Sequence, residues 1–413
     1  MIRIIKVSKT EYFNLLIAMT SVKINRGLLP VIFGFFVMGF CDIVGISSDY
    51  AREAFGWSNT MAGFIPSMVF VWFLFLGIPV GVKMNHWGRK NTVLISMAIT
   101  VFGMVIPLLH YNSVTIMTAY ALLGIGNAIL QVSLNPLLSN VVTNQKLFTS
   151  SLTAGQVVKA LSSLAGPQVV LIAVNVFGNG DNQLWYYSFP ILGAITLFSG
   201  IWLLSVPVPR EETVTGGSGI QALKETFKLL KDKKILILFY GIFFVVGVDV
   251  ATNFISSKIM INRFDWDKAE AGIAPQIYFF SRTVGALIGA FLMTKIQELI
   301  YFRVNIIIAI LALLVLAITN STIVSLAAIG AVGFLASCIF PIIYSTAVQV
   351  RPEKANLISG LMITAVAGGG AVTPAIGAAT DAVGVNAGVF VIMICVLYLT
   401  YCAFVVKIKN KVY

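Results

Sequence analysis

Apolar runs of about 20 residues follow one another along almost the whole chain, separated by short polar interruptions. A run of this length crosses the hydrocarbon core of a bilayer as one helix. Backbone polar groups must be paired within each lipid-facing segment, so helices are the default spanning structure. Charged residues make up only 11% of the chain, against about 25% in soluble domains. The segments are too long and uniformly apolar for a membrane β-barrel. The sequence predicts an all-α membrane protein.

The apolar runs predict twelve transmembrane helices. They are expected at 28–50, 61–83, 91–110, 115–140, 150–174, 185–206, 235–257, 271–294, 304–319, 321–348, 355–379 and 386–407. The long polar interruption at 207–234 is rich in Gly, Ser and Thr at first and then carries five lysines, which suits a linker with a short amphipathic surface helix. We therefore expect two six-helix bundles, 1–206 and 235–413, joined by a cytoplasmic linker at 207–234.

Lysine and arginine residues predict the orientation, because they concentrate in cytoplasmic loops. With the N-terminus inside, 22 of them fall in inside segments and 4 in outside loops, namely Arg52, Lys258, Arg263 and Lys268. This split predicts a multi-pass protein of the cell inner membrane with both termini cytoplasmic. The net charge of +12 follows from this topology, and no basic run interleaved with aromatics indicates nucleic acid. The mixed residues 1–27 do not resemble a cleaved signal, and Met19 is a candidate start.

The two predicted halves repeat one pattern in the same sense. Pro66 and Pro275 are 209 residues apart, each preceded by a similar stretch that begins Ala-Gly. Asp42 and Asp249 are 207 apart in matching apolar surroundings. A pair of glycines ends the second span of each half, and small residues of this kind permit close contact between helices. Same-sense repeats related by an axis along the membrane normal are typical of transporters built from two parallel halves.

Four charged residues lie inside predicted spans, where a charge costs at least about 2.5 kcal/mol and normally faces a partner or an aqueous space. They are Asp42, Lys159, Asp249 and Arg282, and their charges sum to zero. The simplest pairing is Asp42 with Lys159 and Asp249 with Arg282. The pairs either hold helices in register or form a midplane site where protonation or solute binding replaces one partner.

Uncharged polar residues recur at a similar depth. Asn127, Gln131 and Asn135 are spaced by four in the fourth span, Gln156 precedes Lys159 by three in the fifth, and Asn253 follows Asp249 by one turn in the seventh. Amides suit a hydroxyl-rich solute, although hydrogen bonding between helices is the other interpretation. Aromatic side chains for sugar stacking are sought among Phe70, Trp72, Tyr278 and Phe280, where packing is the commoner role.

The loop after the second span reads Gly81-Val82-Lys83-Met84-Asn85-His86-Trp87-Gly88-Arg89-Lys90. It resembles the Gly-x-x-x-Asp-x-x-Gly-Arg-Lys signature of the major facilitator superfamily, with Asn85 in place of the usual Asp. The resemblance implies a gating loop formed by Gly81, Gly88, Arg89 and Lys90, without the contact attributed to that Asp.

A second resemblance covers nearly the whole chain. The chain is similar to the fucose permease group, the fucose–glucose/galactose–proton symporters. The motifs that carry this resemblance are Gly39-Phe40-Cys41-Asp42, Leu130-Gln131-Val132-Ser133-Leu134-Asn135-Pro136, Leu152-Thr153-Ala154-Gly155-Gln156, Gly247-Val248-Asp249-Val250, Ser281-Arg282-Thr283-Val284-Gly285, Ser337 to Ser345 and Gly368 to Pro374. It implies a central sugar site, proton symport and Asp42 as the proton-coupling residue.

Two residues depart from the fucose permease pattern. Gln131 stands where that group has a glutamate that works with the aspartate, so a relay of two carboxylates is not expected. Lys159 stands where fucose permease has a neutral amide. Lys159 either neutralises Asp42 or binds the carboxylate of an acidic solute, such as a sialic or uronic acid. A neutral sugar or amino sugar is the first expectation, and an acidic sugar is the alternative.

Other function classes find little support. No Gly-x-x-x-x-Gly-Lys-[Ser/Thr] motif provides an ATP site. The histidines His86 and His110 lie at span ends without a metal or nucleophile cluster, so we expect no enzyme, metal or cofactor. A drug or metabolite efflux antiporter is the rival within transport. The expected protein is a monomer whose partners are a sugar or sugar acid, protons and the bilayer. Its predicted substrate site comprises Asp42, Asn127, Gln131, Gln156, Lys159, Asp249, Asn253 and Arg282.

Overall fold

The computed structural model describes residues 26–57, 59–142, 147–211, 219–266 and 268–406. Met19 lies outside these residues. The first helices are α2 (Leu28–Met38), the 3₁₀ turn η1 (Gly39–Ile43), α3 (Val44–Phe55), α4 (Asn59–Trp87), α5 (Arg89–Leu109), α6 (Ser113–Val141), α7 (Phe148–Ile172), the π-turn η3 (Ala173–Phe177), η4 (Asn182–Tyr187) and α8 (Ser188–Ser205).

The polar interruption that follows contains α9 (Gly219–Leu229). The remaining helices are α10 (Lys233–Phe264), α11 (Lys268–Ala271), α12 (Ile273–Leu292), α13 (Glu298–Ile318), α14 (Thr322–Ala336), α15 (Ile339–Val350), η5 (Pro352–Lys354), α16 (Ala355–Thr364), η6 (Ala365–Ala367), α17 (Gly368–Val383) and α18 (Val385–Val405). The described residues contain no β-strand.

These helices fit twelve transmembrane spans in two six-helix halves. Within the described residues, eight helices are long and apolar enough to cross a membrane, and the bent helix 148–177 makes a ninth. The segments α2–η1–α3, α4 and α12 supply the other three spans. The predicted fold class is therefore confirmed. The four cysteines are buried thiols.

Two predicted span boundaries were wrong, because polar side chains find partners within the helix bundle. Helix α13 begins at Glu298 rather than at 304, and Arg303 Nε donates to the Ala403 carbonyl at 3.0 Å. Helix α10 continues to Phe264 rather than ending at 257. Lys258 lies over the Phe254 ring at 4.1 Å, so this predicted loop residue belongs to a helix.

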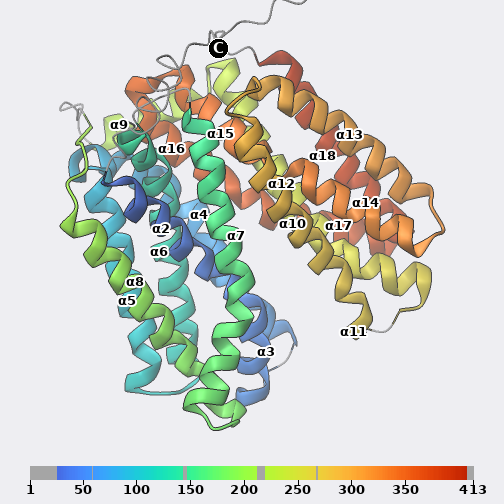
Figure 1. The fold of residues 1–413 in the computed structure, drawn as a ribbon, viewed down its shortest axis with the longest axis horizontal. Coiled ribbons are helices and arrows are strands. Elements are labelled where there is room, and N and C mark those ends of the chain that lie inside the picture. Colours follow the sequence, from blue (N-terminus) through green and yellow to red (C-terminus); the bar gives the residue numbers. More distant parts are fainter. Residues whose placement is uncertain (1–25, 58, 143–146, 212–218, 267, 407–413) are drawn as a thin grey trace, which may run out of the picture.

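The two halves approach each other at one end and diverge toward the other (Figure 1). We call the first the α9 end, because α9 and the last turn of α18 lie there. We call the second the α3 end, where α3 and α11 lie far apart (Figure 1). Helices α4 and α6 of the first half meet α16 of the second, and α7 meets α12 and α15.

Glycines make the contact between α4 and α16 close. A Cβ atom at Gly360 would lie 2.4 Å from the Gly77 carbonyl oxygen, and one at Gly81 would lie 2.8 Å from the Asn356 carbonyl oxygen. Real side chains do not tolerate such distances, so small residues allow the two backbones to touch. The prediction of close helix contact is confirmed for the glycine pair that ends the second span, Gly77 and Gly81, and the contact joins the two halves.

Candidate functional site

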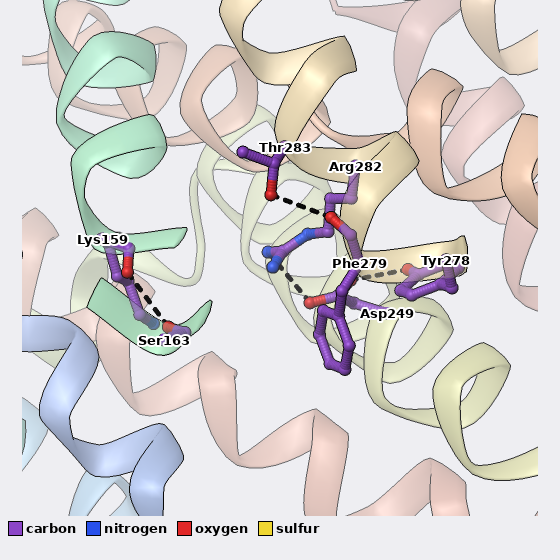
Figure 2. Close-up of polar contacts among 7 residues, drawn as sticks. All are labelled: Lys159, Ser163, Asp249, Tyr278, Phe279, Arg282 and Thr283. Carbon is purple, nitrogen blue, oxygen red and sulfur yellow. Dashed lines mark hydrogen bonds and ion pairs between the residues drawn. The ribbon is translucent and has the colours of Figure 1, made fainter. Parts of the chain in front are cut away.

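An ion pair connects α10 and α12 in the middle of their spans. Arg282 Nη2 lies 3.0 Å from Asp249 Oδ2, and the fully buried Tyr278 donates its hydroxyl to Asp249 Oδ1 at 2.6 Å (Figure 2). The pairing of Asp249 with Arg282 was predicted from the sequence, and the structure confirms it. The side chains of Arg282 and Asp249 are 33% and 24% exposed. A charged pair in a span avoids lipid, so this exposure points to an aqueous space between the halves.

Helix α7 presents a second set of polar groups. Gln156 and Lys159 are both half-buried, and Ser163 donates to the Lys159 carbonyl at 3.0 Å. Residues three and four apart share one face of a helix, so Gln156 and Lys159 lie on the same side. Among the described side chains, no carboxylate lies within ion-pair distance of the Lys159 ammonium.

The 3₁₀ turn η1 packs its backbone against α7 at Lys159. A Cβ at Gly39 would lie 2.5 Å from the Lys159 carbonyl oxygen and 2.8 Å from Ser162 Cβ. A 3₁₀ helix has three residues per turn, so position 42 follows Gly39 on the same face, one turn along. The side chain of Asp42 lies outside the described part of the structure, and its pairing with Lys159 stays a prediction.

Helix α6 contributes buried amides. Asn127 and Gln131 are 3% and 7% exposed, and Gln131 Nε2 donates to Asn127 Oδ1 over a long 3.5 Å. Within the described residues, Asn127 Nδ2 and both polar atoms of the Asn135 side chain have no hydrogen-bond partner. Asn253 is half-buried on α10, one turn from Asp249. Buried amide groups without partners are costly unless water or a solute satisfies them.

Lys159 on α7 and Arg282 on α12 lie at similar distances along their helices from one contact between the halves. Ser150 Oγ on α7 donates to the Ala290 carbonyl on α12 at 2.5 Å. Lys159 is nine residues from Ser150, about 13 Å along α7, and Arg282 is eight residues from Ala290, about 12 Å along α12. In Figure 2, the Arg282 guanidinium points from α12 toward the side of α7 that carries Lys159. The structure thus places a cation at matching height on each half.

The aromatic residues proposed for sugar stacking do not behave alike. Tyr278 is fully buried and its hydroxyl is engaged by Asp249, so its ring offers no open face to a sugar in this conformation. Phe280 is 65% exposed, Trp72 is half-buried, and the side chain of Phe70 lies outside the described part of the structure. The stacking interpretation was therefore wrong for Tyr278.

Arg89 forms the centre of a second polar cluster, at the α9 end. This side chain is only 8% exposed. Its Nε donates to Asn356 Oδ1 of the opposite half at 2.8 Å, and its Nη1 donates to the Pro136 carbonyl at 3.1 Å and to Asn140 Oδ1. We call Asn85, Arg89 and Asn356 the latch, because Asn356 Nδ2 also donates to Asn85 Oδ1 at 2.9 Å.

Local backbone geometry places Arg89 in the latch. Gly88 separates α4 from α5 at φ 80°, a conformation that favours glycine. Glu211 then accepts from the Arg89 backbone N–H at 2.6 Å, and Lys90 donates to the Val206 carbonyl at 2.8 Å. Of the predicted gating-loop residues, Gly81 and Arg89 thus contact the second half, while Gly88 and Lys90 lie beside them against residues 204–211. A gating role for them stays a prediction.

Sequence reasoning missed the hydrogen bond of Tyr278 to Asp249, and it missed Asn356 altogether. Tyr278 lies one turn before Arg282 on α12, so the four-residue spacing was a usable signal for its bond to Asp249. Asn356 bonds to Arg89 across 267 residues of chain, and nothing in its local sequence marks it.

Comparison with known proteins agrees with this architecture. Residues 28–374 match the family model described as the Major Facilitator Superfamily. A glucose/galactose transporter of Brucella abortus biovar 1 (strain 9-941) is 24% identical over 383 residues, which cover 89% of this chain and 90% of the relative.

Solved structures share the fold. The outward conformation of the transporter FucP superimposes with a TM-score of 0.80 at 16% identity, covering 91% of this chain and 97% of FucP. The proton:xylose symporter XylE bound to 6-bromo-6-deoxy-D-glucose gives a TM-score of 0.72 at 12% identity, with 92% and 95% of the two chains covered.

Proposed function

The chain belongs to the Major Facilitator Superfamily, and from that premise we propose that it imports a sugar or sugar derivative by proton symport through alternating access. The observation that carries the sugar assignment is the extent of the likeness to a glucose/galactose transporter, which includes 89% of this chain. The amides of Asn127, Gln131, Gln156 and Asn253 supply donors and acceptors for sugar hydroxyls. The protein is a transporter and not an enzyme.

Alternating access is supported by where the halves touch. Hydrogen bonds between them join Arg89 and Asn85 to Asn356, Thr149 to Ser345, Ser150 to Ala290 and Ser359 to the Val132 carbonyl. These contacts gather at the α9 end, while α3 and α11 diverge (Figure 1). The predicted topology places the α9 end on the cytoplasmic side of the inner membrane. The structure then corresponds to a state closed inside and open outside.

In the proposed cycle, Asp42 takes a proton from outside while the sugar binds between the halves. The substrate site includes Asp42, Gln131, Gln156, Lys159, Asp249 and Arg282. Rocking of the two bundles, 1–206 and 235–413, then opens the α9 end and releases both proton and sugar inside. The protein works as a monomer in this scheme, since each half supplies part of one site.

Transport into proteoliposomes tests the proposal. With an inward proton gradient, we expect radiolabelled sugar to accumulate above equilibrium, and we expect a protonophore to abolish the accumulation. Glucose, galactose and their amino and acidic derivatives form the panel. If the protein transports none of these sugars, the sugar assignment is wrong. Expulsion driven by an opposite gradient would favour the efflux antiporter instead.

A further inference from the structure

The described charges at the centre do not balance. Asp249 is fully engaged, because Oδ2 pairs with Arg282 and Oδ1 accepts from Tyr278. Lys159 stands at the same depth on the opposite half, with no described carboxylate within ion-pair distance. These three central groups therefore sum to one positive charge.

The proposed proton coupling determines which group can neutralise this net positive charge. The predicted partner of Lys159 is Asp42, which belongs to η1, the turn that packs against α7 through Gly39. If Asp42 carries the proton, it is neutral in the loaded state, so it cannot neutralise Lys159 at that moment. A bare ammonium in a span is costly, and a solute with one negative charge would compensate it.

We propose that the transported sugar derivative carries a carboxylate and that Lys159 binds this group. This inference rests on the proposed sugar transport and names the chemical class of the sugar. A phosphorylated sugar fits less well, since a phosphate brings about −1.5 to −2 charges against one net positive charge. Gln156, one turn from Lys159, and Asn127 on α6 bind the hydroxyl groups of the same solute.

The arrangement also explains why sugar and proton travel together. A monocarboxylate that enters with one proton moves no net charge across the membrane. The inside-negative potential therefore does not oppose its uptake. Arg282 contributes positive potential from the other half, while Asp249 and Tyr278 hold it in place.

Matched sugars that differ only at C6 test the proposal directly. Binding of galactose and galacturonate, and of glucose and glucuronate, is measured by thermal shift on the purified full chain, with N-acetylneuraminate as a third acid. We expect an acid to stabilise the protein and its neutral counterpart to bind at least about tenfold more weakly, because a charged hydrogen bond is lost.

Variants assign the effect to one side chain. Lys159→Gln should weaken acid binding by about 10- to 100-fold, whereas Lys159→Arg should keep most of it. Lys258→Gln is the matched control. Lys258 lies over the Phe254 ring in the C-terminal part of α10, away from the proposed site. Circular dichroism and the melting temperature without ligand show whether each variant is folded.

The outcomes separate this inference from the proposed function. A neutral sugar that binds while no acid does leaves sugar transport standing and overturns the carboxylate proposal. Acid binding that survives Lys159→Gln in a folded protein overturns the role of Lys159. Binding of neither class removes both proposals together.

Discussion

At the scale of single residues, the Asp249–Arg282 pair occupies an intermediate position between buried and surface ion pairs. Both side chains are partly exposed, yet they lie in spans whose outer faces meet lipid. Removal of one partner leaves a charge that neither lipid nor the packed core solvates well. The pair therefore contributes to stability mainly because each residue neutralises the charge of the other.

We expect Asp249→Asn and Arg282→Gln each to destabilise the protein by about 1–3 kcal/mol, between the values for exposed and buried pairs. The double variant should cost less than the sum, because no unpaired charge remains. Thermal unfolding in detergent measures this cycle. The pair Asp232–Arg351, at 3.3 Å and outside the spans, is the control and should show a coupling near zero. Additive losses in the central pair would contradict the interpretation.

A second prediction at this scale concerns Asp42. Asp42→Asn should abolish accumulation against a gradient while sugar counterflow continues, because the variant still binds solute but carries no proton. Proteoliposomes with and without a proton gradient distinguish the two activities. Uphill accumulation by the variant would show that another group couples the proton.

The Asp249–Arg282 pair could be predicted from the sequence, because a charge in an apolar run is rare enough to stand out. Pairing each aspartate with the cation of its own half then gave the correct partner for Asp249. The sequence did not predict that Tyr278 would use its hydroxyl instead of its ring, since burial depends on packing between α10 and α12. Asn356 was missed because an amide near a span end has no distinctive local signal.

At the scale of helices, the α4–α16 contact depends on the absence of side chains. The Gly77 carbonyl lies where a Cβ at Gly360 would project, so any larger residue must push the helices apart. This separation acts at the α9 end, where the halves meet.

We expect Gly360→Val to open the α9 end and shift the protein away from the observed state. Spin labels at residues 53 and 273, on exposed positions of α3 and α12, should then report a shorter distance as the α3 end closes. Gly370→Val is the control, since a Cβ at Gly370 meets nothing within 4 Å. An unchanged distance in Gly360→Val would show that the contact does not set the conformation.

Apolar run length predicted where helices lie, and it failed where helices break or extend. The turns η1 and η6 interrupt spans that read as continuous, and α13 extends into residues that read as a loop. These features depend on tertiary partners, such as the Ala403 carbonyl that accepts from Arg303. A window of apolar residues contains no information about such partners.

At the scale of the whole molecule, the latch connects the two halves through one residue, Asn356. Its side chain accepts from Arg89 and donates to Asn85, so both bonds must break before the α9 end opens. The latch therefore favours the observed conformation over the alternative one.

We expect Asn356→Ala to raise the population open at the α9 end by roughly tenfold, as the loss of two hydrogen bonds implies. A cysteine at position 131 should then react faster with an impermeant maleimide added from that side. Asn91→Ala is the control, because Asn91 donates only to the nearby Trp87 carbonyl among the described contacts. Equal reactivity in both variants would argue against a latch at Asn356.

The chemistry of the latch also affects how the transporter responds to its surroundings. The described side-chain partners of Arg89 are carbonyl, hydroxyl and amide oxygens, and Asn85 replaces the acidic residue usual in the family signature. Dissolved salt weakens attraction between opposite charges far more than hydrogen bonds to neutral groups. The balance between the two orientations should therefore hold steady when the ionic strength at the α9 end rises, which separates the latch from the charge-dependent binding proposed at Lys159.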